Sequence, residues 1–134
     1  MKNHFANRKI ITTQDYCRLT RLIQTDRSNI YLLQLLKELL KTSEVMLSES
    51  VPSGVVTMDT IVCLKDLRHG ESQLVKMAYS KSTWRGKKML LINVPILSPL
   101  GISLLGQQVG DVLMERIQID KMVYQPETQR CFDR

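Results

Sequence analysis

The hydrophobic pattern divides this chain into two parts. In residues 1–50 the apolar positions recur at the spacing of a helix, and in residues 51–134 they alternate in the short runs typical of strands. Between the two lies the segment SESVPSG, residues 48–54, whose serines, proline and glycine all disfavour helix. We therefore expect two parts, an N-terminal one over residues 1–50 and a C-terminal one over residues 51–134.

The N-terminal part is expected to form a short antiparallel hairpin of two helices, a small coiled coil. Its first helix begins at Thr12 or Thr13, because a hydroxyl can cap it and Asp15 suits the positive end of the helix dipole. The apolar stripe of this helix consists of Tyr16, Leu19, Leu22 and Ile23. A polar link, QTDRSN, offers a new N-cap at Ser28 or Asn29, and so short a link makes the second helix fold back.

The second helix is more apolar than a two-helix seam requires. Its wide leucine face comprises Leu32, Leu33, Leu35, Leu36, Leu39 and Leu40. Such a face must be covered. We favour packing on the C-terminal part, and a homodimer through this helix is the alternative.

The C-terminal part is expected to be a compact antiparallel sheet with one short helix against a face, which makes the chain α+β. Candidate strands are residues 55–67, 72–80 and 88–94, with one or two more in residues 111–125. Gly70 supplies the turn between the first two.

The short helix lies in SPLGISLLGQQVGD, residues 98–111. Ser98 is a good N-cap, and Pro99 suits the first helical position because its missing N–H would be unpaired there anyway. Gly106 ends the helix where a left-handed residue is wanted. These glycines match neither the dinucleotide-binding nor the phosphate-loop motif, so we expect no phosphate loop.

Composition adds a basic bias without naming a partner. The net charge is +6, the pI is about 9.4, and the excess of cations is shared by both parts. Charge is concentrated only around one tryptophan, in Lys81, Trp84, Arg85, Lys87 and Lys88. We interpret this segment as a solvated hairpin loop, with a weak nucleic-acid contact as the alternative. No apolar run is long enough for a bilayer and no signal peptide is evident, so we expect a cytoplasmic protein without membrane contact.

The chain shows no pattern of a metal, cofactor or catalytic site. Cys17, Cys63 and Cys131 are widely spaced and odd in number, so we expect reduced thiols, the first two buried. His4 and His69 have no ligand-like neighbours. We therefore expect no metal, no cofactor and no catalytic residue.

Three segments of the C-terminal part together resemble a known family. VVTMDTIVCLKDLRHGE (residues 55–71), SPLGISLLGQQVGDVL (98–113) and VYQPE (123–127) resemble the C-terminal domain of the GreA/GreB superfamily of transcription elongation factors. The VVTM and YQPE segments and the short helical arms are most similar to the branch called regulator of nucleoside diphosphate kinase (Rnk). In residues 1–50 the resemblance is one of architecture.

This resemblance implies a fold like that of the FK506-binding proteins and binding to bacterial RNA polymerase at its secondary channel. The C-terminal domain would dock at the channel rim through the turn at Ser98, Pro99 and Gly101, with the hairpin pointing inward. Transcript cleavage in this family needs carboxylates at the hairpin tip to help hold Mg²⁺.

The tip of this hairpin offers one carboxylate, Asp26, beside the cation Arg27. We therefore expect a polymerase-binding regulator that does not stimulate cleavage, and that is not itself an enzyme. Asp26 is then a solvated loop residue that helps to cap the second helix. The alternatives are a cleavage factor that uses Asp26 and a dimeric adaptor protein. A prolyl isomerase is disfavoured because aromatic residues are few and scattered.

Overall fold

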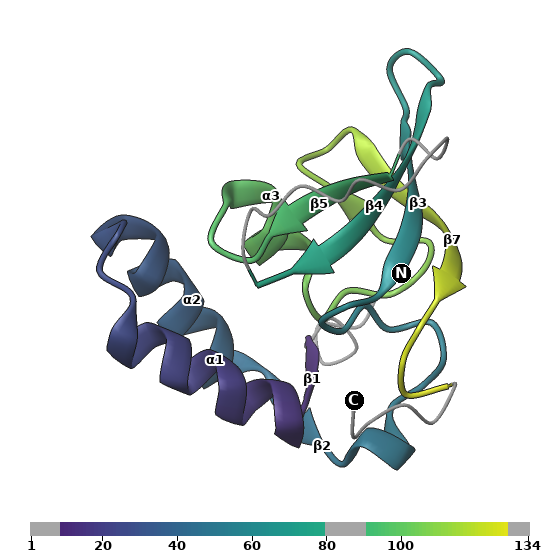
Figure 1. Cartoon of the computed structure of the whole chain (residues 1–134). Helices are drawn as coiled ribbons and strands as arrows, with labels where there is room; N and C mark the ends of the chain where they lie inside the picture. The colour runs from purple at the N-terminus through teal and green to yellow at the C-terminus, as the bar shows by residue number, and fades with distance from the viewer. Residues whose placement is uncertain (1–8, 80–90, 129–134) are drawn as a thin grey trace.

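The computed structural model describes residues 9–79 and 91–128 (Figure 1). Its elements, in chain order, are β1 (Ile10–Thr12), α1 (Thr13–Thr25), α2 (Ile30–Thr42), β2 (Glu44–Met46), the 3₁₀ turn η2 (Ser48–Ser50), β3 (Ile61–Asp66), β4 (Ser72–Ala78), β5 (Leu91–Pro95), α3 (Pro99–Leu104), β6 (Val112–Leu113) and β7 (Ile117–Tyr124). A helical hairpin is thus followed by a sheet with one short helix. The expected α+β class is confirmed, and the architecture is consistent with an FK506-binding-protein-like domain.

The helical hairpin begins and ends where its capping residues predict. The Thr12 hydroxyl accepts the backbone N–H of Asp15 at 3.0 Å and caps α1. The Asn29 side chain accepts the N–H of Leu32 at 3.0 Å and caps α2, which identifies it rather than Ser28 as the N-cap.

The base of the hairpin is closed by a two-stranded parallel ribbon that the sequence does not predict. β1 precedes α1 and β2 follows α2, and the two pair from Ile10 with Glu44 to Thr12 with Met46. The Ile10 N–H also donates to the carbonyl of Gly106, beyond the end of α3, at 3.2 Å. The ribbon therefore joins the hairpin to the C-terminal part.

The main sheet has the strand order β5-β4-β3-β7-β6. β3 pairs with β4 and β7 in antiparallel fashion, and the β3–β4 turn is closed by the Gly70 N–H donating to the Asp66 carbonyl at 2.7 Å. β4 and β5, however, are parallel, so the sheet is mixed where an antiparallel one was expected. The expected hairpin loop around Trp84, with Lys81, Arg85, Lys87 and Lys88, falls on residues 80–90, which lie outside the described residues.

One hydrophobic core spans both parts of the chain. It contains Leu19, Leu32 and Leu36 from the hairpin together with apolar residues of the loops, sheet and α3. The favoured role of the leucine face is confirmed, since five of its six members are buried and Leu35 alone remains 36% exposed. Homodimerisation through this helix, and the division at residue 50, stay predictions.

Candidate functional site

The turn that begins α3 is organised by Ser98. The Ser98 hydroxyl accepts the Gly101 N–H at 3.0 Å and donates to the Pro95 carbonyl at 2.7 Å, while Pro99 occupies the first turn of the helix and is exposed. The predicted cap and the proline position are confirmed. Pro99 is thus the residue of this turn that is most available to a partner.

Gly101 is buried, and it allows α3 to approach β5 closely. A Cβ atom at this position would lie 2.1 Å from the carbonyl oxygen of Pro95, well inside any permitted contact. Of the three predicted docking residues, the structure therefore exposes Pro99, partly covers Ser98 and buries Gly101. Gly101 therefore has a structural role: its lack of a side chain lets the turn lie close to the Pro95 carbonyl.

The other end of α3 is held by Lys9. The Lys9 ammonium donates to the carbonyls of Ile102 at 2.9 Å and Ser103 at 3.1 Å, which leaves fewer carbonyls unpaired at the helix end. Burial lowers the pKa of Lys9 to about 8, against a smaller opposing effect of Asp111. The sequence does not predict this role, because a lone lysine ahead of a strand carries no signal of a contact 93 residues away.

At the hairpin tip, Asp26 is engaged by its own loop. Its carboxylate accepts the Ser28 hydroxyl at 2.6 Å and the Ser28 N–H at 2.7 Å, and these bonds lower the pKa of Asp26. Its N–H donates to the Leu22 carbonyl at 2.8 Å and ends α1. Asp26 therefore shapes the link and the end of α1, whereas Asn29 caps α2, contrary to the expectation that Asp26 would help to cap that helix.

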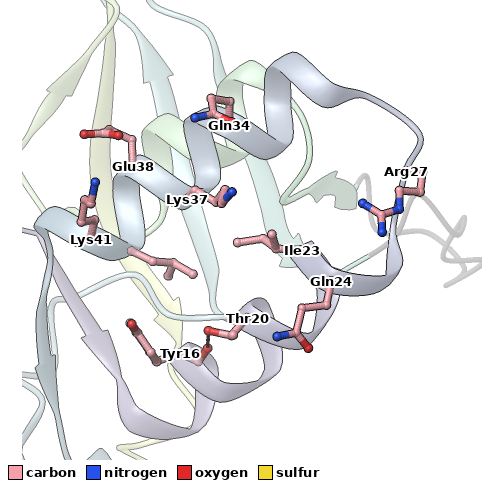
Figure 2. Close-up of a pocket in the computed structure, with 10 residues that line it drawn as sticks. Tyr16, Thr20, Ile23, Gln24, Arg27, Gln34, Lys37, Glu38 and Lys41 are labelled. Carbon is pink, nitrogen blue, oxygen red and sulfur yellow. Dashed lines mark hydrogen bonds between the residues drawn. The ribbon is translucent and has the colours of Figure 1, made fainter.

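The tip does not gather a set of metal ligands. Within residues 9–79 and 91–128, no three His, Cys, Asp or Glu side chains lie close enough to hold a metal ion. Arg27 is exposed in the same link, and its side chain lines the space between the two helices (Figure 2). The tip alone thus presents one carboxylate and one guanidinium.

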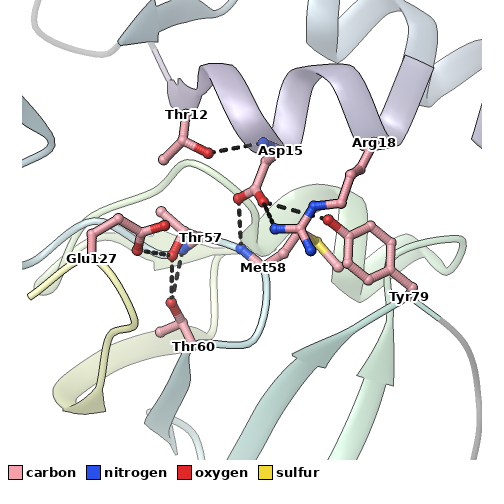
Figure 3. Close-up of polar contacts among 8 residues, drawn as sticks. All are labelled: Thr12, Asp15, Arg18, Thr57, Met58, Thr60, Tyr79 and Glu127. Carbon is pink, nitrogen blue, oxygen red and sulfur yellow. Dashed lines mark hydrogen bonds and ion pairs between the residues drawn. The ribbon is translucent and has the colours of Figure 1, made fainter. Parts of the chain in front are cut away.

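A buried carboxylate, Asp15, connects the hairpin to the C-terminal part (Figure 3). It is 1% exposed, and one oxygen accepts the backbone N–H of Met58 at 3.0 Å. The other oxygen lies 3.1 Å from the Arg18 guanidinium and accepts the Tyr79 hydroxyl at 3.4 Å. Burial raises the pKa of Asp15, and the Met58 N–H and Arg18 offset this only in part. The sequence predicts Asp15 in the first helical turn but does not predict its distant partner.

A second polar cluster fixes the loop that Asp15 contacts. The Thr57 and Thr60 hydroxyls lie 2.8 Å apart, and Thr57 also donates to the Glu127 carboxylate at 2.7 Å (Figure 3). Burial raises the pKa of Glu127. Gln125, which is 2% exposed, donates to the carbonyls of Pro52 and Val55 at 3.0 and 2.8 Å. Gln125 and Glu127 of the VYQPE segment thus hold the loop that receives the hairpin.

An open groove of about 650 Å³ runs between α1 and α2 (Figure 2). Its lining residues are Tyr16, Thr20, Ile23, Gln24, Arg27, Gln34, Lys37, Glu38, Leu40 and Lys41. The sequence predicts the two helices but not this groove, because residues of the polar faces form its rims.

The two cysteines within the described residues differ in exposure. Cys63 is buried and free as expected, but Cys17 is free and exposed, so its expected burial was wrong. Cys17 follows Tyr16 on α1 and points away from the core formed by Leu19. Cys131 and His4 lie outside the described residues. None of the described helices is long and apolar enough to cross a membrane.

Comparison with known proteins gives a clear likeness in structure. No protein-family model and no curated protein sequence matches the chain. The solved structure titled prokaryotic transcription elongation factor GreA/GreB, from Nitrosomonas europaea, matches with 28% sequence identity and a TM-score of 0.70. The match covers 87% of this chain and 98% of that one. The fold is that of a Gre-type factor.

Weaker matches name Gre-factor homologues. The GreA factor homolog 1 (Gfh1) of Thermus thermophilus matches with 16% identity and a TM-score of 0.44, over 87% of this chain and 99% of that one. Gfh1 of Thermus aquaticus matches with 17% identity and a TM-score of 0.40, over 88% and 97%.

Proposed function

We propose that this chain regulates transcription by binding bacterial RNA polymerase at its secondary channel. The observation that carries the proposal is the likeness to the GreA/GreB elongation factor of Nitrosomonas europaea, which extends over 87% of this chain with a TM-score of 0.70. A match of this length cannot be confined to the hairpin or to the sheet domain alone. The chain acts as a binding protein and is not itself an enzyme.

The C-terminal part docks on the polymerase through the turn at Ser98 and Pro99. Support comes from the exposure of Pro99 and from the bonds of Ser98 to Pro95 and Gly101, which fix this turn before a partner arrives. A preorganised surface loses less conformational entropy on binding.

Docking is tested by binding of the purified chain to core RNA polymerase, measured by pull-down and by fluorescence anisotropy. Pro99→Glu is the informative variant, because a carboxylate in the first turn suits the helix dipole yet places a charge on the proposed contact. Val123→Glu introduces the same charge at an exposed position of β7 and is its control. We expect Pro99→Glu to weaken binding and Val123→Glu to leave it unchanged. Absence of binding by the unaltered chain ends the proposal.

The hairpin occupies the channel without stimulating transcript cleavage. The tip offers the single carboxylate of Asp26, which already accepts two hydrogen bonds from Ser28, and Arg27 beside it would repel a cation. A cleavage assay on stalled elongation complexes tests this step. We expect no stimulation by the chain or by Asp26→Ala, and cleavage that depends on Asp26 would identify a cleavage factor instead.

Within the Gre-type factors we place the chain in the Rnk branch. The support is the VVTM and YQPE segments and the short arms, since α1 and α2 have 13 residues each and are about 20 Å long. Arms of this length favour competition with other secondary-channel proteins over contact with the catalytic centre. A competition assay against a cleavage factor tests this placement, and we expect the chain to displace that factor.

A further inference from the structure

The groove between α1 and α2 has an apolar floor and polar rims. Ile23 and Leu40 lie on its floor and Tyr16, which is 37% exposed, closes the end near β1. Figure 2 shows Ile23 and Lys37 pointing into the space between the two helices. No residue of the α3 turn lines this groove, although α3 contacts α2 elsewhere (Figure 1).

Cations dominate the rims of this groove. The charged residues of the lining are three cations, Arg27, Lys37 and Lys41, and one anion, Glu38. The ion pairs within the described residues join Arg18 to Asp15 and Arg116 to Asp66, so these three cations are not neutralised there. Lys37 and Lys41 also stand four residues apart on α2, where like charges repel, while Glu38, three residues before Lys41, attracts it, so the lining keeps an excess of positive charge. An anionic partner would relieve this repulsion.

The spacing of the cations indicates an extended partner. Lys37 and Lys41 lie one helical turn apart, and Arg27 lies at the far end of the groove, in the link. One phosphate or carboxylate cannot reach all three. A partner helix of about 12 residues would span the groove, which is about 20 Å long because α1 has 13 residues.

The floor favours a helix over a single-stranded nucleic acid. Proteins bind single-stranded nucleic acids by stacking successive bases on aromatic side chains. This groove contains one aromatic residue, Tyr16, at its end. Aliphatic side chains such as Ile23 and Leu40 instead suit the apolar stripe of an amphipathic helix.

The charges of the groove disfavour a second copy that would place its own hairpin there. The free cations of its own α1–α2 hairpin, Arg27, Lys37 and Lys41, would face the same cations across the interface. We propose that the groove between α1 and α2 binds an acidic amphipathic helix of a partner protein, which completes a three-helix bundle. This interaction does not depend on docking through the α3 turn.

The proposal can be tested with the full chain and a synthetic probe. The probe is a helical peptide of about 16 residues with a leucine stripe flanked by glutamates. A matched peptide carries glutamine in place of each glutamate, and a uridine oligonucleotide is the nucleic-acid probe. Binding is followed by NMR titration of the ¹⁵N-labelled chain. We expect the acidic peptide to shift the signals of Thr20, Ile23 and Gln34, and the neutral peptide to bind about tenfold more weakly.

Variants locate the binding. Lys37→Glu combined with Lys41→Glu is expected to weaken the acidic peptide about tenfold or more and to remove most of its salt dependence. Both positions are exposed, so the variant should fold, which circular dichroism checks. Lys121→Glu, at an exposed position of β7, is the control and should bind like the unaltered chain.

Three results would overturn the proposal. The acidic peptide does not bind at about 1 mM, or it binds equally well to the Lys37/Lys41 variant, or the oligonucleotide shifts the groove signals while the peptide does not. Binding to core polymerase is measured separately, so a failure here leaves the proposed function standing, and the reverse also holds.

Discussion

Replacing Asp15 by alanine should loosen the hairpin from the C-terminal part, because its carboxylate is the acceptor for a backbone N–H of the opposite part. That N–H belongs to Met58, which is 1% exposed, and the bond measures 3.0 Å. Asp15→Ala leaves the donor without a partner in a site that water does not reach. Asp15→Asn keeps an oxygen at nearly the same place and serves as the conservative variant.

The size of the effect follows from the contacts that are lost. A buried donor left unpaired costs about 1–3 kcal/mol. The ion pair with Arg18 adds about 0–1 kcal/mol, because the Arg18 side chain is 42% exposed and solvent weakens the pair. The carboxylate in the first turn of α1 adds about 0.3–1 kcal/mol, and relief of its own burial offsets part of the total. We expect Asp15→Ala to lower the free energy of unfolding by about 2–3 kcal/mol, and Asp15→Asn by less than about 1 kcal/mol.

Urea denaturation followed by circular dichroism measures the free energies, and hydrogen exchange measures the Met58 amide itself. The exchange rate of that amide should be much higher in Asp15→Ala than in the unaltered chain, and this increase should exceed that of the neighbouring amides in the loop. Asp120→Ala, at an exposed position of β7, is the control and should change stability by less than about 0.5 kcal/mol.

Two outcomes contradict this reasoning. If Asp15→Ala and Asp15→Asn destabilise equally, the negative charge and not the hydrogen bond holds the parts together. If Asp15→Ala behaves like Asp120→Ala, the contact contributes nothing to folding.

Three further predictions follow from the same structure. Burial raises the pKa of Asp15, so its folded form favours the protonated carboxyl. The free energy of unfolding of the unaltered chain, relative to that of Asp15→Asn, should therefore be highest below about pH 3.9 and should fall as the pH rises through the raised pKa. Urea titrations at several pH values measure this difference. The Lys9 ammonium should titrate near pH 8 by NMR, in a signal that Lys9→Met removes. Because the pKa of Lys9 is lowered on folding, its contribution to stability should be largest above about pH 10.4 and should be lost as the pH falls through 8. Gly101→Ala should destabilise the chain by about 1–3 kcal/mol or more, since its Cβ meets the Pro95 carbonyl, whereas Gly54→Ala, with contacts no closer than 3.8 Å, should be nearly neutral in thermal unfolding.

Local signals in the sequence predicted much of the fold. Thr12, Ser98 and Gly106 mark helix ends because a cap depends on one residue and its near neighbours, and the structure has each of them in that role. Gly106, for example, adopts the expected left-handed conformation with a φ of 85°. The leucine face of α2 is likewise predictable, since burial follows from helical spacing.

What the sequence did not predict depends on contacts between distant residues. The parallel pairing of β4 with β5 leaves no local mark, because the connection and not the strands sets the direction. The segment Val55 to Thr60 looked like the start of a strand, yet Asp59 adopts a φ of 70° and the strand begins only at Ile61. The buried role of Asp15 is of the same kind, because its partner lies 43 residues further along the chain.

The backbone pairing and the buried carboxylate that tie the hairpin to the C-terminal part lie at one end of it. The β1–β2 ribbon and Asp15 hold its base, and the link after Asp26 lies at the opposite end (Figure 1). Whole heptads inserted into both arms next to the link would lengthen the hairpin by about 10 Å each without touching that base. The length of the hairpin and its attachment at the base can therefore be varied independently. A series of chains with graded arm lengths would measure how deep a binding channel is.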